Sequence, residues 1–161
     1  MKQKTKKNIL IYSVSIAVPL LVGVLSALLT MKNMDIYKEL ETPPLSPPSV
    51  LFPVVWSVLY VLMGISCGMI WKYKKTDKNA EKALYYYAAS LVFNFVWSIL
   101  FFNLRLFTPA FIWLLMLLYL IIRTVICYAK VYKPAAYLQI PYIIWVMFAG
   151  YLNLGIRILN K

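Results

Sequence analysis

The sequence predicts an all-α integral membrane protein, built as a bundle of five transmembrane helices. Of its 161 residues, 63% are hydrophobic, whereas a typical soluble domain is about 45–50% apolar. The apolar residues gather in five runs, each close to the ~20 residues that a helix needs to cross a bilayer. In the hydrocarbon core, such runs satisfy their backbone hydrogen bonds as helices. We therefore expect residues 1–161 to form a single membrane domain.

The first predicted span covers residues 9–29 and follows a lysine-rich start at Lys2, Lys4, Lys6 and Lys7. This arrangement is similar to the beginning of a secretory signal peptide. The apolar run is longer than the ~7–15 residues of a signal peptide's apolar core and ends without a small-residue cleavage site. We therefore expect it to remain in the protein as a helix.

Residues 30–50 are predicted to form a proline-rich loop on the outer side. Prolines at 43, 44, 47 and 48 fix an extended course, because each lacks a backbone donor and restricts the residue before it. A single amphipathic turn fits residues 35–40. The sequence leaves two roles open for this loop: a plain spacer, or a cover over the outer end of the bundle.

The four remaining spans are predicted at 51–71, 84–104, 109–128 and 135–156. With the N-terminus inside, eleven Lys and Arg residues fall on the inner side of the membrane and five on the outer side. This asymmetry predicts an inside N-terminus and an outside C-terminus in a multi-pass protein of the cell membrane. Arg123 lies near the inner end of the fourth span, where it either reaches the headgroups or pairs with a ligand.

The charge pattern and the missing residue types exclude several functions. The net charge of +12 lies mostly at span edges, which indicates contact with anionic lipid headgroups and no nucleic-acid partner. Histidine is absent, and all five acidic residues lie between the apolar runs. We therefore predict no metal site, no resident cofactor and no conventional catalytic machinery. Cys67 and Cys127 fall within spans and are expected to be reduced, buried thiols.

Three of the predicted helices carry aromatic and polar side chains along one face. Amides and hydroxyls are costly against lipid, so these faces should point inward and form an aromatic pocket for a flat, mostly apolar ligand. Simple packing, or an aromatic belt at the interface, is the alternative. The faces comprise Trp56, Tyr60 and Gly64 on the second span, Asn94, Trp97, Ser98 and Phe101 on the third, and Pro141, Trp145, Ala149 and Asn153 on the fifth.

Two further patterns allow more than one interpretation. Gly64 and Gly68 form a small-xxx-small pattern, which fits close packing within the chain as well as a homodimer. Trp71 and Trp113 are expected in the aromatic belt or facing lipid.

Three motifs closely resemble those of the TspO/MBR family, the tryptophan-rich sensory proteins whose mitochondrial members are called translocator protein or peripheral benzodiazepine receptor. The resemblance covers roughly residues 9–160 and includes the helix count and the loop. The motifs are Phe52-Pro-Val-Val-Trp56-Ser-Val-Leu-Tyr60-Val-Leu-Met-Gly64, Asn94-Phe-Val-Trp97-Ser-Ile-Leu-Phe-Phe102 and Pro141-Tyr-Ile-Ile-Trp145-Val-Met-Phe-Ala149-Gly-Tyr-Leu-Asn153.

The resemblance implies a pocket among the five helices that opens toward the proline-rich loop and binds porphyrins such as protoporphyrin IX. It implies a sensor or regulator of tetrapyrrole metabolism or stress. Two alternatives are a transporter of porphyrin or other apolar ligands and a light- and oxygen-dependent protoporphyrin-degrading enzyme that uses Trp56 and Trp145. The expected ligand-binding residues are Trp56, Tyr60, Asn94, Trp97, Ser98, Phe101, Trp145, Phe148 and Ala149.

The chain departs from the family pattern in the loop and at the C-terminus. Ile36, Leu45 and Val50 stand where the family commonly has loop tryptophans, Thr42 replaces a lysine, and Arg157 replaces a C-terminal tryptophan. A loop without indoles offers less stacking surface, so we expect any photodegradation to be slow or absent. Some members also bind cholesterol. The residues Val146, Tyr151 and Arg157 fit a loose sterol consensus that is more simply a belt tyrosine beside a basic side chain.

Overall fold

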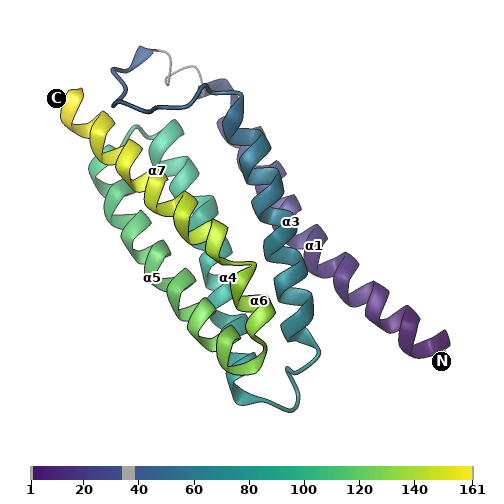
Figure 1. Ribbon diagram of the computed structural model, residues 1–161. Helices are drawn as coiled ribbons and strands as arrows, with labels where there is room; N and C mark the ends of the chain where they lie inside the picture. The colour runs from purple at the N-terminus through teal and green to yellow at the C-terminus, as the bar shows by residue number, and fades with distance from the viewer. Residues whose placement is uncertain (1, 34–38, 161) are drawn as a thin grey trace.

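The structure, a computed structural model, describes residues 2–33 and 39–160 (Figure 1). Five of its helical segments are long and apolar enough to cross a membrane, which confirms the predicted five-helix membrane fold. Ile36 and most of the turn expected at 35–40 lie outside the described residues. The helices are α1 (Lys2–Thr30), extended by η1 (Met31–Asn33), α3 (Leu51–Trp71), α4 (Lys78–Ser98), extended by η2 (Ile99–Asn103), α5 (Phe107–Val131), α6 (Lys133–Tyr137) and α7 (Ile140–Leu159).

The third span begins at a carboxylate cap and ends in an unusual turn. Helix α4 begins at Lys78 rather than at residue 84, because the Asp77 carboxylate caps it by accepting a hydrogen bond from the backbone N–H of Asn79 at 2.7 Å. At its other end the chain continues as a π-helical turn, in which the N–H of Leu104 donates to the carbonyl of Ile99 at 3.0 Å. Such turns are frequent at functional sites.

The last span is broken, whereas the sequence predicts one helix over 135–156. Pro141, in the first turn of α7, has no N–H with which to continue a helix from α6. The buried Gln139 stabilises the break by donating from its Nε2 to the Oγ of Ser66 at 3.2 Å, and Ser66 in turn donates to the carbonyl of Ala135 at 2.9 Å. The polar groups at the break are thereby satisfied within the protein.

Helix α1 is the least buried of the five spans. Its most apolar window is 11% buried, against 33–44% for the other four spans. Figure 1 shows α1 lying along α3, with its N-terminal end projecting away from the other helices. One long face of α1 is thus left to the lipid.

The small-xxx-small pattern packs α3 against α1. A Cβ atom placed on Gly64 would clash with the backbone of Ile16 and lie 2.7 Å from the carbonyl oxygen of Ser15. A Cβ atom on Gly68 would lie 2.6 Å from the ring of Tyr12. The glycines therefore serve close packing within the chain, and the homodimer remains a prediction without this motif as support.

Candidate ligand-binding site

The buried Asn94 joins three helices at the centre of the predicted site. The Tyr60 hydroxyl of α3 donates to Oδ1 of Asn94 at 3.3 Å, and Nδ2 of Asn94 donates to the Tyr142 hydroxyl of α7 at 2.9 Å. All three side chains are buried. A hydrogen-bonded polar group inside a membrane protein fixes the relative positions of the helices that carry it. Tyr142 was not among the predicted site residues, although it lies one helical turn before Trp145.

Aromatic rings pack between α3 and α7 next to this network. Trp56 stacks on Tyr60 with ring centroids 5.4 Å apart and meets the edge of Tyr142 at 6.1 Å. Phe52 meets Trp145 edge-on at 5.9 Å. We call these five rings the α3–α7 seam. Phe52 is the second contributor that the sequence analysis did not include, and its position one turn before Trp56 is the signal that could have indicated it.

A cavity of about 220 Å³ lies beside the seam, between α1, α3 and the end of α4. Of the predicted residues, Trp56, Tyr60, Trp97 and Ser98 line it. The wall on α1 was not predicted, because α1 carries no aromatic face. The unpredicted lining comprises Leu20, Gly23, Val24, Ser26, Ala27 and Thr30 on α1, Phe52, Pro53 and Ser57 on α3, and Phe102 on η2.

The other predicted residues do not line the cavity. Phe101 is buried against Trp97, with ring centroids 5.5 Å apart. Trp145 and Phe148 lie together on α7, with centroids 5.6 Å apart, and Ala149 is buried on the same helix. The structure thus places four predicted residues on the cavity wall and the remaining five behind it or at the seam.

Several buried polar atoms near the site have no hydrogen-bond partner among the described residues. They include the indole nitrogens of Trp97 and Trp145 and both side-chain polar atoms of Asn153. Most buried polar groups in proteins are paired, so such groups call for an explanation. The indole N–H of Trp97 is the clearest case, because Trp97 also lines the cavity and its N–H is a donor without an acceptor among the described residues.

The proline-rich loop is fastened to the end of α7. Asn160 accepts from the backbone N–H of Glu41 at 3.0 Å and donates to its carbonyl at 2.8 Å. The Tyr151 hydroxyl donates to the carbonyl of Pro44 at 2.8 Å, and Pro43 packs directly on Gly155. Figure 1 shows this segment running across one end of the bundle toward the C-terminus. The loop is therefore a cover rather than a free spacer.

Three of the departures from the family pattern, Leu45, Val50 and Arg157, lie at the surface. Leu45 is 85% exposed and Val50 is 76% exposed, and neither lines the cavity. Arg157 donates from its Nε to the Thr108 hydroxyl at 2.8 Å, which joins α7 to α5. Together with the Tyr151 hydrogen bond to the loop, this contact gives the sterol-like pattern a structural role within the chain.

Two residues outside the site differ from simple expectations. Trp113 is half-buried between α4 and α5, where its ring stacks on Phe93 at 4.3 Å and its N–H donates to the Phe93 carbonyl at 2.8 Å. Arg123 lies over the Tyr86 ring at 5.3 Å and contacts the Tyr86 hydroxyl at 3.5 Å. The Tyr86 side chain therefore holds Arg123 in place, and whether Arg123 also reaches the headgroups stays a prediction. Among residues 2–33 and 39–160 no cluster of Cys, Asp or Glu could hold a metal ion.

The fold and the site together define a class of protein: a multi-pass helical membrane protein with an aromatic cavity between its first three spans and a loop fastened over one end of the bundle. A model of the TspO/MBR family matches residues 15–159, and the chain belongs to this family.

Curated relatives agree with this assignment. The chain is 34% identical over 157 residues to the tryptophan-rich protein TspO of Chlorobaculum tepidum, which covers 96% of this chain and 98% of that protein. It is 37% identical over 118 residues to the translocator protein of Bos taurus, covering 73% of this chain and 70% of the relative. It is 28% identical over 130 residues to the tryptophan-rich sensory protein of Cereibacter sphaeroides, covering 81% and 80%.

Proposed function

We propose that this protein binds a porphyrin-like tetrapyrrole, such as protoporphyrin IX, and acts in the cell membrane as a sensor or regulator of tetrapyrrole level. The observation that carries the proposal is the aromatic cavity at Trp56, Tyr60 and Trp97, with the unpaired indole N–H of Trp97. A flat macrocycle offers faces that stack on these rings, and its carboxylates are acceptors for the indole donor.

The size of the cavity sets a condition on binding. Its volume of about 220 Å³ is smaller than the ~300–1,000 Å³ of sites for drug-sized ligands. A porphyrin therefore requires the cavity to widen. Helix α1 supplies one wall and is the least buried span, so an outward movement of α1 is the least costly way to provide the space.

The test is a titration of the purified protein with protoporphyrin IX in the dark, followed by the Soret band and by tryptophan fluorescence. Ala27→Phe fills the cavity from α1, where Ala27 is exposed at its edge. We expect this substitution to weaken binding by about tenfold or more, because it removes the space in which the rings stack. Ala17→Phe adds the same bulk to an exposed position of α1 outside the cavity and should bind like the wild type.

Unchanged affinity in a folded Ala27→Phe protein would place the ligand elsewhere and overturn the assignment of this cavity. A protein that does not bind protoporphyrin IX at all would overturn the proposed function itself. Loss of binding in both Ala27→Phe and Ala17→Phe would show a general effect of added bulk on α1 rather than a blocked site.

A further inference from the structure

A second, larger cavity of about 410 Å³ lies between the same three helices, toward the opposite end of the bundle. The wall on α1 consists of side chains between Leu10 and Val18, α3 contributes Cys67 and Trp71, and α4 contributes Tyr87 and Ala88 among others. It shares no lining residue with the cavity at Trp56. Its volume lies within the ~300–1,000 Å³ typical of small-molecule sites.

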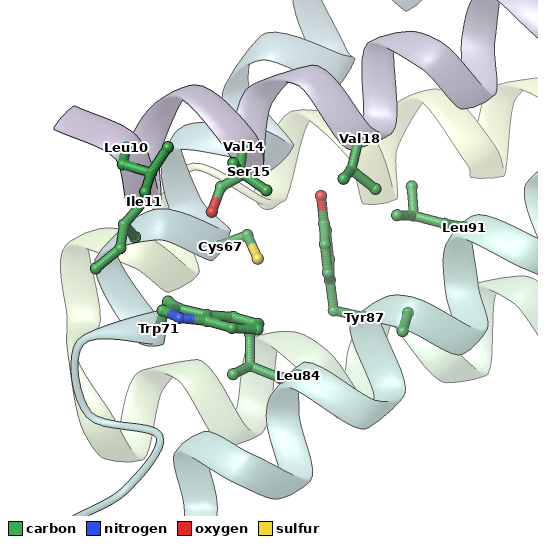
Figure 2. A pocket seen from close by; sticks show the side chains of 11 residues that line it. Leu10, Ile11, Val14, Ser15, Val18, Cys67, Trp71, Leu84, Tyr87 and Leu91 are labelled. Atoms are coloured by element: carbon green, nitrogen blue, oxygen red, sulfur yellow. The ribbon is translucent and has the colours of Figure 1, made fainter. Parts of the chain in front are cut away.

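One polar group in this cavity has no partner. Tyr87 is 5% exposed, and its hydroxyl has no hydrogen-bond partner among the described residues. Figure 2 shows the Tyr87 ring extending from α4 toward α1, with its hydroxyl between Val18 and Cys67. A buried hydroxyl without a partner costs free energy that a phenylalanine at the same place would not. An acceptor supplied by a bound molecule would remove this cost.

The remaining surface of the cavity selects an apolar body. Figure 2 shows the flat face of Trp71 on one side and aliphatic side chains of α1 and α4 around it. Among the described residues that line the cavity, none is charged. A carboxylate, a phosphate or an ammonium group would therefore be buried there without a counter-charge, which is strongly unfavourable.

The occupant should reach the cavity from the bilayer. Leu10 and Val14, on its α1 wall, are 64% and 53% exposed, on a helix that faces lipid over most of its surface. Ala88 is exposed on the α4 wall. A molecule dissolved in the membrane can enter between α1 and α4 without crossing water.

We propose that this cavity is a second ligand site, which takes a membrane-dissolved molecule with an apolar body and one carbonyl or ester oxygen that accepts a hydrogen bond from Tyr87. Two sources share this chemistry, namely lipid esters and lipid-soluble quinones. The site is independent of the porphyrin proposal, because no residue of one cavity lines the other.

The experiment measures the thermal unfolding midpoint of the purified full-length protein with three probes. These are methyl oleate for lipid esters, decylubiquinone for quinones, and 1-octadecene as an apolar molecule with no acceptor. We expect at least one carbonyl-bearing probe to raise the midpoint by about 5 °C at a concentration one hundredfold above its Kd, and 1-octadecene to have no such effect. The probe that acts identifies the source.

Variants locate the effect. Tyr87→Phe should lose the rise, and without probe it should be at least as stable as the wild type because it removes an unpaired hydroxyl. Ala88→Phe fills this cavity and should also lose the rise, whereas Ala27→Phe fills the other cavity and should keep it.

Three results would overturn the proposal. The first is that neither carbonyl-bearing probe raises the unfolding midpoint. The second is that 1-octadecene raises it equally, and the third is that the rise persists in Tyr87→Phe or Ala88→Phe. A rise lost in Ala27→Phe but kept in Ala88→Phe would assign these probes to the cavity at Trp56 and would equally contradict a second site.

Discussion

At the scale of single residues, Asn94 is the polar centre of the candidate site, and its replacement tests how much this network stabilises the fold. Asn94→Leu leaves the hydroxyls of Tyr60 and Tyr142 without their shared partner. We expect a loss of about 1–2 kcal/mol in the free energy of unfolding, measured by denaturation with SDS. In a Tyr60→Phe/Tyr142→Phe background the same substitution should cost clearly less, because the hydroxyls are already absent. Equal costs in the two backgrounds would show that the network carries no coupling energy.

The two helix-borne tryptophans separate binding from degradation. Phenylalanine keeps an aromatic ring, so Trp56→Phe and Trp145→Phe should bind protoporphyrin IX in the dark nearly as well as the wild type. Phenylalanine cannot donate an electron as indole can, so degradation that uses these tryptophans should be reduced. Trp56 lines the cavity and Trp145 lies at the seam, so Trp56→Phe should reduce any light-dependent loss of porphyrin absorbance more strongly. We expect slow or absent bleaching by the wild type, since Leu45 and Val50 bring no indole to the loop.

Illuminated detergent without protein is the control for that measurement. Fast bleaching by the wild type, lost in both phenylalanine variants, would contradict our expectation and move the protein into the enzyme class. Equal bleaching in every sample would mean that the porphyrin destroys itself and that the protein only binds it.

At the scale of helices, the glycines of α3 determine how closely α1 can approach. Gly64→Ala places a methyl group against the backbone of Ile16 and Ser15, so the two helices must separate. We expect the midpoint of thermal unfolding to fall, although alanine is intrinsically the better helix former by about 1 kcal/mol. Gly150→Ala is the matched control, because its new methyl group would lie 3.9 Å from Phe111, an ordinary contact distance. It should be neutral or stabilising, and a similar loss in both variants would contradict the close packing of α1 on α3.

The elements that the sequence predicted best are those bounded by abrupt changes in composition. Helix α3 has the predicted bounds, Leu51–Trp71, because a proline-rich segment precedes it and lysines follow it. Helix α4 begins earlier than predicted, because hydropathy detects only the apolar part of the helix, whereas its first turn is polar and is capped by Asp77. The break before α7 was not predicted, although Pro141 was a local signal for it; the buried contacts of Gln139 that stabilise the break come from residues distant in the sequence.

The candidate site was predictable only on the helices that carry mixed aromatic and polar faces. Trp56, Tyr60, Trp97 and Ser98 stood out because they share such faces, and the structure places them on one cavity. On the α1 wall of that cavity, the hydroxyls of Ser26 and Thr30 were the signal that could have indicated an inward face, whereas the other side chains look the same as lipid-facing ones in sequence. Only the three-dimensional packing of α1 on α3 assigns these other side chains to a cavity.

At the scale of the whole molecule, orientation in the membrane remains a prediction from the distribution of lysine and arginine. The loop at 39–50 and the connection at 72–77 lie at opposite ends of the bundle (Figure 1). Cysteines introduced at Leu45 and Thr76 should therefore react with an impermeant maleimide from opposite sides of sealed, right-side-out vesicles, Leu45→Cys from outside and Thr76→Cys only after permeabilisation. The two native cysteines are buried, so they add little background. Reaction of both positions from the same side would contradict the topology.

The fastening of the loop by Asn160 has a kinetic consequence. The loop is held by two hydrogen bonds between the Asn160 side chain and the backbone of Glu41, and by the Tyr151 hydroxyl. These contacts can open without disturbing any helix. If this opening precedes entry of a ligand from the outer side, the observed association rate cannot rise indefinitely with ligand concentration. It should level off at the rate at which the loop opens, a first-order constant of the protein alone. Asn160→Ala should raise that plateau while changing the equilibrium affinity much less, so the loop would govern how long a bound molecule stays rather than which molecule is chosen.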